Sequence, residues 1–74
     1  MAVRLFLSSG TQRTIEAADA AHLDGAFFLV TRRDPGTGGV DTLLTLPSTD
    51  VRAAEIRKNG VRTDYVLGRG QASR

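Results

Sequence analysis

The strongest structural signal in this sequence is the stretch Val51-Arg-Ala-Ala-Glu-Ile-Arg-Lys-Asn-Gly-Val-Arg-Thr-Asp-Tyr-Val-Leu67. It consists of two runs of mixed apolar and charged residues on either side of Asn59-Gly60. Asparagine and glycine tolerate the positive φ angles that a type I′ turn requires, so this dipeptide indicates a two-residue β-hairpin. We therefore predict two antiparallel strands joined at this turn.

The register that follows from this turn separates an apolar face from a charged face. The cross-strand pairs on the first face are Lys58 with Val61, Ile56 with Thr63, and Ala54 with Tyr65. The apolar residues of that face, which we expect to be buried, are Ala54, Ile56, Val61, Tyr65 and Leu67. The residues of the opposite, mostly charged face are Ala53, Glu55, Arg57, Arg62, Asp64 and Val66. One dry and one wet face are typical of a half-buried antiparallel pair.

Charges on the wet face contribute little to this register. In it Glu55 lies opposite Asp64 and Arg57 lies opposite Arg62, so like charges face each other directly, whereas the diagonal pairs are attractive. The net effect on a solvated face is about a few tenths of a kcal/mol. The turn and the apolar face therefore set the predicted register.

The same residues also allow a helical alternative. A helix that starts at Ser48 or Thr49 and ends at Gly60 would have good terminal signals. Its apolar spacing is poor, because Ile56 points away from the other apolar side chains of such a helix. We favour strands, with a helix over 49–59 as the alternative.

Alternating or β-branched and aromatic segments predict further strands at 3–8, 11–16, 20–23, 26–32 and 40–46. Asp24-Gly25 is a second hairpin dipeptide, which pairs His22 with Phe27 and Ala21 with Phe28. Because Phe27 and Phe28 are adjacent in a strand, we expect one in the core and the other exposed at an interface.

The connections are less regular. We interpret 17–19 as a bulge or corner, although the Ala-rich segment within 14–24 also allows a short helix. Residues 34–39 read as a mobile loop, and 47–50 as a tight turn or one 3₁₀ turn. The polar, glycine-rich segment 68–74 is predicted to be a disordered tail.

Together these elements predict an all-β fold, a small antiparallel meander of six or seven short strands closed into a barrel. Residues 1–67 form its single domain. If both helical alternatives held, the order would instead be β-α-β-β-α-β, an α+β, ferredoxin-like arrangement.

Composition narrows the classes of function. A chain of 74 residues hides only about 60% of its unfolded surface, so we expect it to gain support from self-association or from a protein partner. Cysteine is absent and His22 is the single histidine, so no metal site or other cofactor is expected. No apolar stretch approaches 18 residues and no signal peptide is evident, which favours a cytoplasmic protein without membrane contact.

The run Leu44-Thr-Leu-Pro-Ser-Thr-Asp-Val51 resembles the end of SH3-like and Sm-like barrels, and the Asp24-Gly25 hairpin fits the same scheme. The chain is also similar to small uncharacterised β-rich proteins of GC-rich bacteria. SH3 domains bind Pro-rich peptides with aromatic clusters that include Trp, which this chain lacks, so that activity is not implied. Sm-like proteins form RNA-binding rings, but their base-contacting loop residues have no match here.

Catalytic constellations are not evident. His22 has no partner set for acid–base or metal chemistry, so we interpret it as a structural histidine. The segment Gly36-Thr-Gly-Gly39 lacks the Gly-Lys-Ser/Thr of a phosphate-binding loop and precedes a strand, so it is interpreted as a hairpin loop. No small-molecule substrate is suggested.

The sequence therefore predicts a non-enzymatic binding or assembly module that acts through self-association or a protein partner. The alternative is nucleic-acid binding through an arginine-rich surface, with Phe6 or Phe28 available for stacking. The net charge is only +2, and acidic residues are interleaved with basic ones. The residues that we expect to contact a partner or nucleic acid are Arg32, Arg33, Arg57, Lys58, Arg62 and Phe28.

Overall fold

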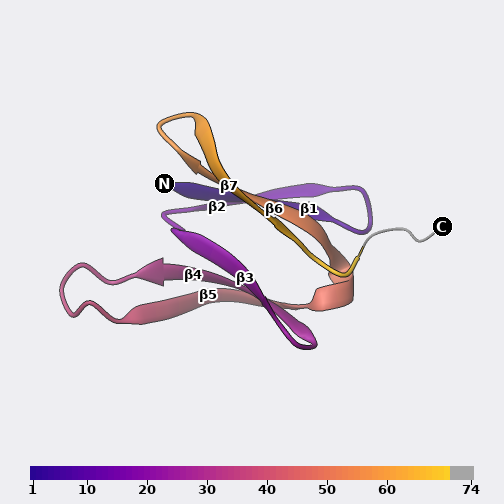
Figure 1. Ribbon diagram of the computed structural model, residues 1–74, viewed down its shortest axis with the longest axis horizontal. Coiled ribbons are helices and arrows are strands. Elements are labelled where there is room, and N and C mark those ends of the chain that lie inside the picture. The colour runs from indigo at the N-terminus through magenta and orange to yellow at the C-terminus, as the bar shows by residue number, and fades with distance from the viewer. Residues whose placement is uncertain (71–74) are drawn as a thin grey trace.

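Residues 1–70 are described by the computed structural model, and they form two antiparallel sheets (Figure 1). The regular elements in chain order are β1 (Ala2–Leu7), β2 (Gln12–Glu16), β3 (Ala20–Asp24), β4 (Phe27–Arg33), β5 (Val40–Pro47), the 3₁₀ turn η1 (Ser48–Asp50), β6 (Val51–Lys58) and β7 (Val61–Leu67). This confirms the predicted all-β meander and contradicts both helical alternatives. No helix within residues 1–70 has the length and apolar character needed to cross a lipid bilayer.

The strands are divided between two layers, which Figure 1 shows one above the other. One sheet has the order β2-β1-β6-β7 and the other the order β3-β4-β5. The chain changes sheets at Ala17, which has a φ of 64°. The Ala17 amide still donates to Met1 O, whereas the Asp19 amide donates to Thr31 O in β4. This corner confirms the bulge predicted at 17–19. It also leaves two separate sheets among the described residues, where we expected a closed barrel.

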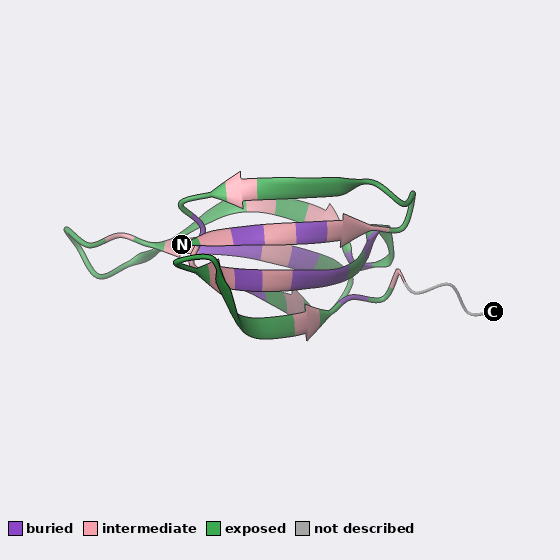
Figure 2. Ribbon diagram, turned by 90° about the horizontal axis from the view of Figure 1, so that it is seen from above, coloured by how far each residue is buried: buried purple, intermediate pink, exposed green. Residues whose placement is uncertain are grey.

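The core lies between the two sheets and is supplied mainly by their central strands. Figure 2 shows buried residues alternating with more exposed ones along these strands. The larger buried side chains are Val3, Leu5, Phe28, Val30, Val51 and Ile56. Each contributes about 1.5–3 kcal/mol by leaving water. As predicted, the adjacent phenylalanines face opposite sides: Phe28 is fully buried and Phe27 is 53% exposed.

The turn between β3 and β4 lies one residue later than predicted. Asp24 pairs with Phe27, so the two loop residues are Gly25 and Ala26. Gly25 has a φ of 58° and Ala26 does not have a positive φ, which is the pattern of a type II′ turn. The observed register sets Leu23 opposite Phe28. The predicted one would have set the smaller Ala21 there, so the shift pairs larger apolar side chains over the core.

The β6–β7 hairpin begins as predicted and then departs from the predicted register. Asn59 and Gly60 have φ angles of 54° and 78°, and Lys58 pairs with Val61. A bulge follows, because Ile56 pairs with Asp64 and Thr63 is the extra residue. The Thr63 hydroxyl donates to Ile56 O at 3.2 Å, which satisfies a carbonyl at the irregularity.

This bulge reverses the faces of β7 beyond residue 63. Val66, predicted to be on the wet face, now lies opposite the buried Ala54 and packs against the core. Tyr65 and Leu67, predicted to be buried, are 46% and 55% exposed. The prediction failed here because a bulge adds one residue to one strand only, and turn chemistry does not reveal it. The predicted contact of Glu55 with Asp64 is also replaced, since Glu55 lies opposite Tyr65.

Past β7 the described chain continues alongside β6, through the first residues of the predicted tail. The Gly68 amide donates to Arg52 O at 2.9 Å and the Gly70 amide donates to Val51 O at 2.7 Å. A Cβ on Gly68 would overlap Val51 O, so this approach requires glycine. Residues 68–70 therefore lie against β6, and the rest of the predicted tail, 71–74, lies outside the described residues.

Candidate functional site

The outer side of the four-stranded sheet, which faces away from the core, combines arginines with exposed aromatic and apolar side chains. It is formed by residues of β1 and β6 that alternate with core residues, by Arg52 at a bulge of β6 opposite β1, by Arg62, and by the β7 residues that the bulge at Thr63 turns outward. We call this surface the cationic face. Its residues are Arg4, Phe6, Arg52, Ala53, Glu55, Arg57, Arg62, Tyr65 and Leu67.

The strand register arranges this face in rows that run across β1, β6 and β7. The row nearest the Asn59-Gly60 turn consists of Ala2, Arg57 and Arg62. The next row consists of Arg4, Glu55 and Tyr65. The third row consists of Phe6, Ala53 and Leu67. The face is therefore charged near the Asn59-Gly60 turn and apolar in its third row. Arg52 lies beyond this third row.

Three arginines within residues 1–70 converge on the carboxylate of Glu55. The N–O distances are 3.9 Å from Arg4, 3.4 Å from Arg57 and 3.6 Å from Arg62. The Glu55 side chain is only 14% exposed, whereas the three arginine side chains are 31–55% exposed. One carboxylate cannot neutralise three guanidinium groups, so the cluster keeps a surplus of positive charge that is open to solvent.

Further contacts hold two of these guanidinium groups in place. Arg62 lies over the ring of Tyr65, with its Cζ atom 5.1 Å from the ring centroid, in a cation–π contact. Arg57 donates from Nη2 to Gly60 O at 2.8 Å, which ties it to the hairpin turn. Because these side chains are already positioned, binding of an anion would restrict little additional rotamer freedom.

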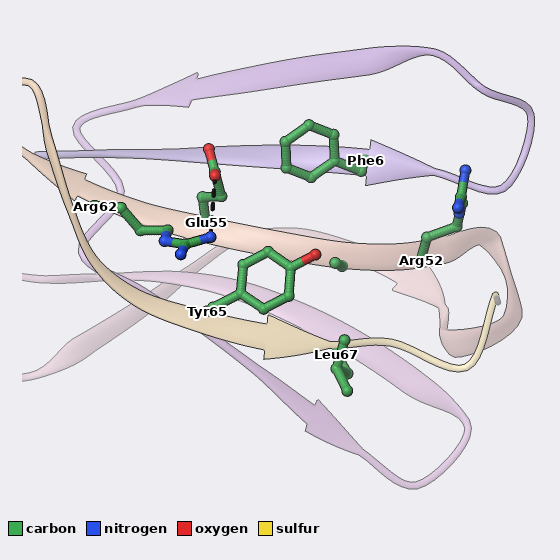
Figure 3. A pocket seen from close by; sticks show the side chains of 7 residues that line it. Phe6, Arg52, Glu55, Arg62, Tyr65 and Leu67 are labelled. Atoms are coloured by element: carbon green, nitrogen blue, oxygen red, sulfur yellow. Dashed lines mark ion pairs between the residues drawn. The ribbon is translucent and has the colours of Figure 1, made fainter.

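A groove of ≈ 530 Å³ crosses the apolar part of the face (Figure 3). Phe6 and Tyr65 stand on opposite sides of β6, from β1 and β7, with Arg62 and Arg52 toward opposite ends. The groove exists because Ala53, on β6 between them, has too small a side chain to fill the space. Its lining residues are Phe6, Arg52, Ala53, Glu55, Arg62, Tyr65 and Leu67.

The structure brings together part of the basic grouping expected from the sequence. Arg57 and Arg62 are direct cross-strand partners, and Lys58 is exposed beside them at the hairpin turn. Arg32 and Arg33 do not join them, because β4 lies between β3 and β5 in the other sheet.

Two further residues expected to contact a ligand, Arg32 and Phe28, have other roles in the structure. Arg32 is engaged with Asp41 at 3.1 Å within its own sheet. Phe28 is fully buried in the core and cannot stack on a ligand. Phe6, the other aromatic considered for stacking, does lie on the cationic face and is partly exposed.

Sequence reasoning did not identify Arg4, Arg52, Tyr65 and Leu67 as site residues. The alternation of β1 was a usable signal, since it set Arg4 and Phe6 on the side opposite the buried Val3. The pairing of β1 with β6 was not accessible, because it joins segments about fifty residues apart in the chain. Tyr65 and Leu67 were missed because of the bulge at Thr63.

The other motifs singled out in the sequence lie on the three-stranded sheet and in its β4–β5 loop. His22 is exposed on β3, opposite Leu29. Residues 36–39 lie in the loop between β4 and β5, where Asp34 Oδ1 accepts from the Gly36 amide at 2.8 Å, which confirms the predicted hairpin loop. Within residues 1–70 no group of three or more His, Cys, Asp or Glu side chains is arranged to hold a metal ion.

The cationic face is thus a partly apolar groove beside a cluster of arginines held by one carboxylate. Comparison of the chain with known protein families, with curated proteins and with solved structures found no match.

Proposed function

We propose that the protein is a non-enzymatic binding module that holds single-stranded nucleic acid on its cationic face. The observation that carries this proposal is the convergence of three arginines on Glu55 beside the exposed ring of Tyr65. Single strands offer both a chain of phosphates and unpaired bases, and proteins bind them by combining basic side chains with aromatic ones. An acidic peptide offers the negative charge but no unpaired base.

The distribution of charge supports an anionic ligand on this surface. The four arginines and one carboxylate of the cationic face give it a formal charge of +3, or +2 when Glu16 of the neighbouring β2 is included. The whole chain has a formal charge of +2. The surplus of the chain is therefore concentrated on one side, and the remaining surface is close to neutral. Nucleic acid is available in the cytoplasm, which is the location expected from the sequence.

The salt dependence of binding follows from the net positive charge of the cationic face. If two or three phosphates are neutralised, log K falls by about 1.4–2.1 per tenfold rise in salt for a single strand. Affinity should then fall about 7- to 20-fold between 50 and 200 mM salt.

The test is fluorescence anisotropy with a labelled oligo-dT at these two salt concentrations. The double variant Arg57→Glu/Arg62→Glu should abolish binding. The matched control is Arg13→Glu/Arg33→Glu, which makes the same change in net charge at exposed arginines outside the cationic face. Wild-type protein that does not bind at 50 mM salt, or a control that loses binding equally, would remove the proposal.

A second candidate function, self-association, is favoured by the outer side of the three-stranded sheet. Phe27 and Leu43 are 53% and 38% exposed in this sheet, and Leu29 shares the side of Phe27 because both alternate with the buried Phe28. A second copy that covers these side chains would supply burial that a chain of 74 residues lacks. Light scattering should then give a mass above that of the monomer, and Phe27→Ser should return it to the monomer.

The resemblance to SH3-like and Sm-like barrels stays a prediction. Its local feature is present, since β5 ends at Pro47, the 3₁₀ turn η1 starts at Ser48, and β6 starts at Val51. The proposal above does not depend on this resemblance.

A further inference from the structure

We propose that the groove over Ala53 is a seat for one unstacked nucleobase, held between Phe6 and Tyr65, with the flanking phosphates at Arg62 and Arg52. This inference rests on the proposed function and deepens it, because it names the part of the strand that each residue binds.

The groove combines apolar and charged side chains, as a flat base between two phosphates requires. Ala53 is 4% exposed and forms the floor, and its row partners Phe6 and Leu67 form walls. The volume of ≈ 530 Å³ lies within the range of about 300–1,000 Å³ that is usual for small-ligand sites. Phe6, Tyr65 and Leu67 offer ring faces and methyl groups to a base, and the charged side chains of Arg52, Glu55 and Arg62 complete the lining.

Phe6 and Tyr65 are well separated on the cationic face. Phe6 and Tyr65 are on strands separated by β6, about 9.6 Å apart, and are offset by two residues, about 6.7 Å, along the strand direction. Their Cα positions are therefore about 12 Å apart. Stacked bases repeat at about 3.4 Å, so a base that enters the groove between the two rings has to leave its own stack.

The arginines stand where an extended strand would place its phosphates. Arg62 and Arg52 lie at opposite ends of the groove (Figure 3). Arg62 already contacts the Tyr65 ring, so the residue that would bind a phosphate also abuts the base seat. A strand that follows β6 would meet charge, then the aromatic seat, then charge again, which matches the order phosphate, base, phosphate.

Tyr65 provides a direct readout of an occupied seat. It is the single tyrosine and the chain has no tryptophan, so the near-ultraviolet emission of the protein comes from this side chain. A base stacked on the ring should quench that emission. An abasic oligonucleotide of equal length carries the same phosphates without bases, and should bind without quenching it.

The experiment compares oligo-dT with the abasic oligonucleotide by emission and by anisotropy. Loss of the base should weaken binding by about 5- to 150-fold, the range that one stacked base contributes. Tyr65→Ala should weaken binding of oligo-dT by a similar factor and leave the salt slope unchanged, whereas Tyr65→Phe should retain the affinity. Ala53→Leu, which fills the seat, should act like Tyr65→Ala, and a far-ultraviolet spectrum checks its fold.

The two proposals fail in distinguishable ways. If neither oligonucleotide binds, the proposed function is wrong. If both bind equally, with a steep salt dependence and no quenching, the cationic face binds phosphate alone and the base seat is wrong. Equal competition by poly-glutamate for oligo-dT would also overturn the base seat, because a peptide carries the charge but no base.

Discussion

Glu55 should contribute to stability and oppose ligand binding, so the variant Glu55→Gln should change the two properties in opposite directions. The carboxylate lies 3.4–3.9 Å from guanidinium nitrogens of Arg4, Arg57 and Arg62. Ion pairs with exposed partners contribute about 0.2–1 kcal/mol each, so loss of the charge should cost about 0.6–3 kcal/mol in total. For a domain of this size the melting temperature should fall by about 2–24 °C.

The same variant leaves the three guanidinium groups without their shared counter-charge. A negative charge about 6 Å from a bound phosphate costs about 0.7 kcal/mol in water, so its removal should tighten binding of oligo-dT roughly threefold at low salt. The salt slope should steepen by about 0.7 if one additional phosphate is neutralised.

Thermal unfolding monitored by circular dichroism gives the melting temperature, and fluorescence anisotropy gives the affinity for oligo-dT. The control is Glu16→Gln, which makes the same charge change on the same side of the sheet at a residue that forms no ion pair within residues 1–70. It should melt close to the wild-type temperature. If Glu55→Gln had the same melting temperature as Glu16→Gln, the account of the arginine cluster would be refuted. It would also be refuted if Glu55→Gln lowered both the stability and the affinity for oligo-dT.

Three further predictions test the fold that positions the face. Phe28→Ala should cost about 3–5 kcal/mol and leave the chain largely unfolded by circular dichroism, because Phe28 is fully buried; a cooperative melt near the wild-type temperature would contradict the core. Gly68→Ala should lower the melting temperature, since its Cβ would overlap Val51 O, and an unchanged melt would place this segment elsewhere. Deletion of Thr63 should remove the bulge and keep the pair of Ile56 with Asp64, so binding should persist; loss of binding by a folded deletion variant would indicate a different register.

Local features of the fold could be predicted because they depend on neighbouring residues. Asn59 and Gly60 adopt the positive φ angles that their turn requires, and the alternation of β1 buries Val3 and Leu5. The corner at Ala17 was also expected. In each case the relevant energy comes from backbone conformation or from which side of one strand is apolar, and both are visible within a few residues.

Features that depend on distant partners could not be predicted in the same way. The cationic face needs β1 beside β6, and sequence pattern does not state which strands pair across the chain. The bulge at Thr63 decides that Tyr65 faces outward and Val66 inward. Phe28 was expected to contact a ligand because the alternation of a strand shows only that Phe27 and Phe28 face opposite sides. It does not show which of the two is buried.

The central claim, that the outer side of the β2-β1-β6-β7 sheet binds single-stranded nucleic acid, is tested most directly by mapping the contact. Isotope-labelled protein titrated with oligo-dT should show amide chemical-shift changes that concentrate in β1, β6 and β7, around Phe6, Glu55 and Tyr65. Changes concentrated in β3, β4 and β5, or an unchanged spectrum at saturating oligonucleotide and low salt, would contradict it.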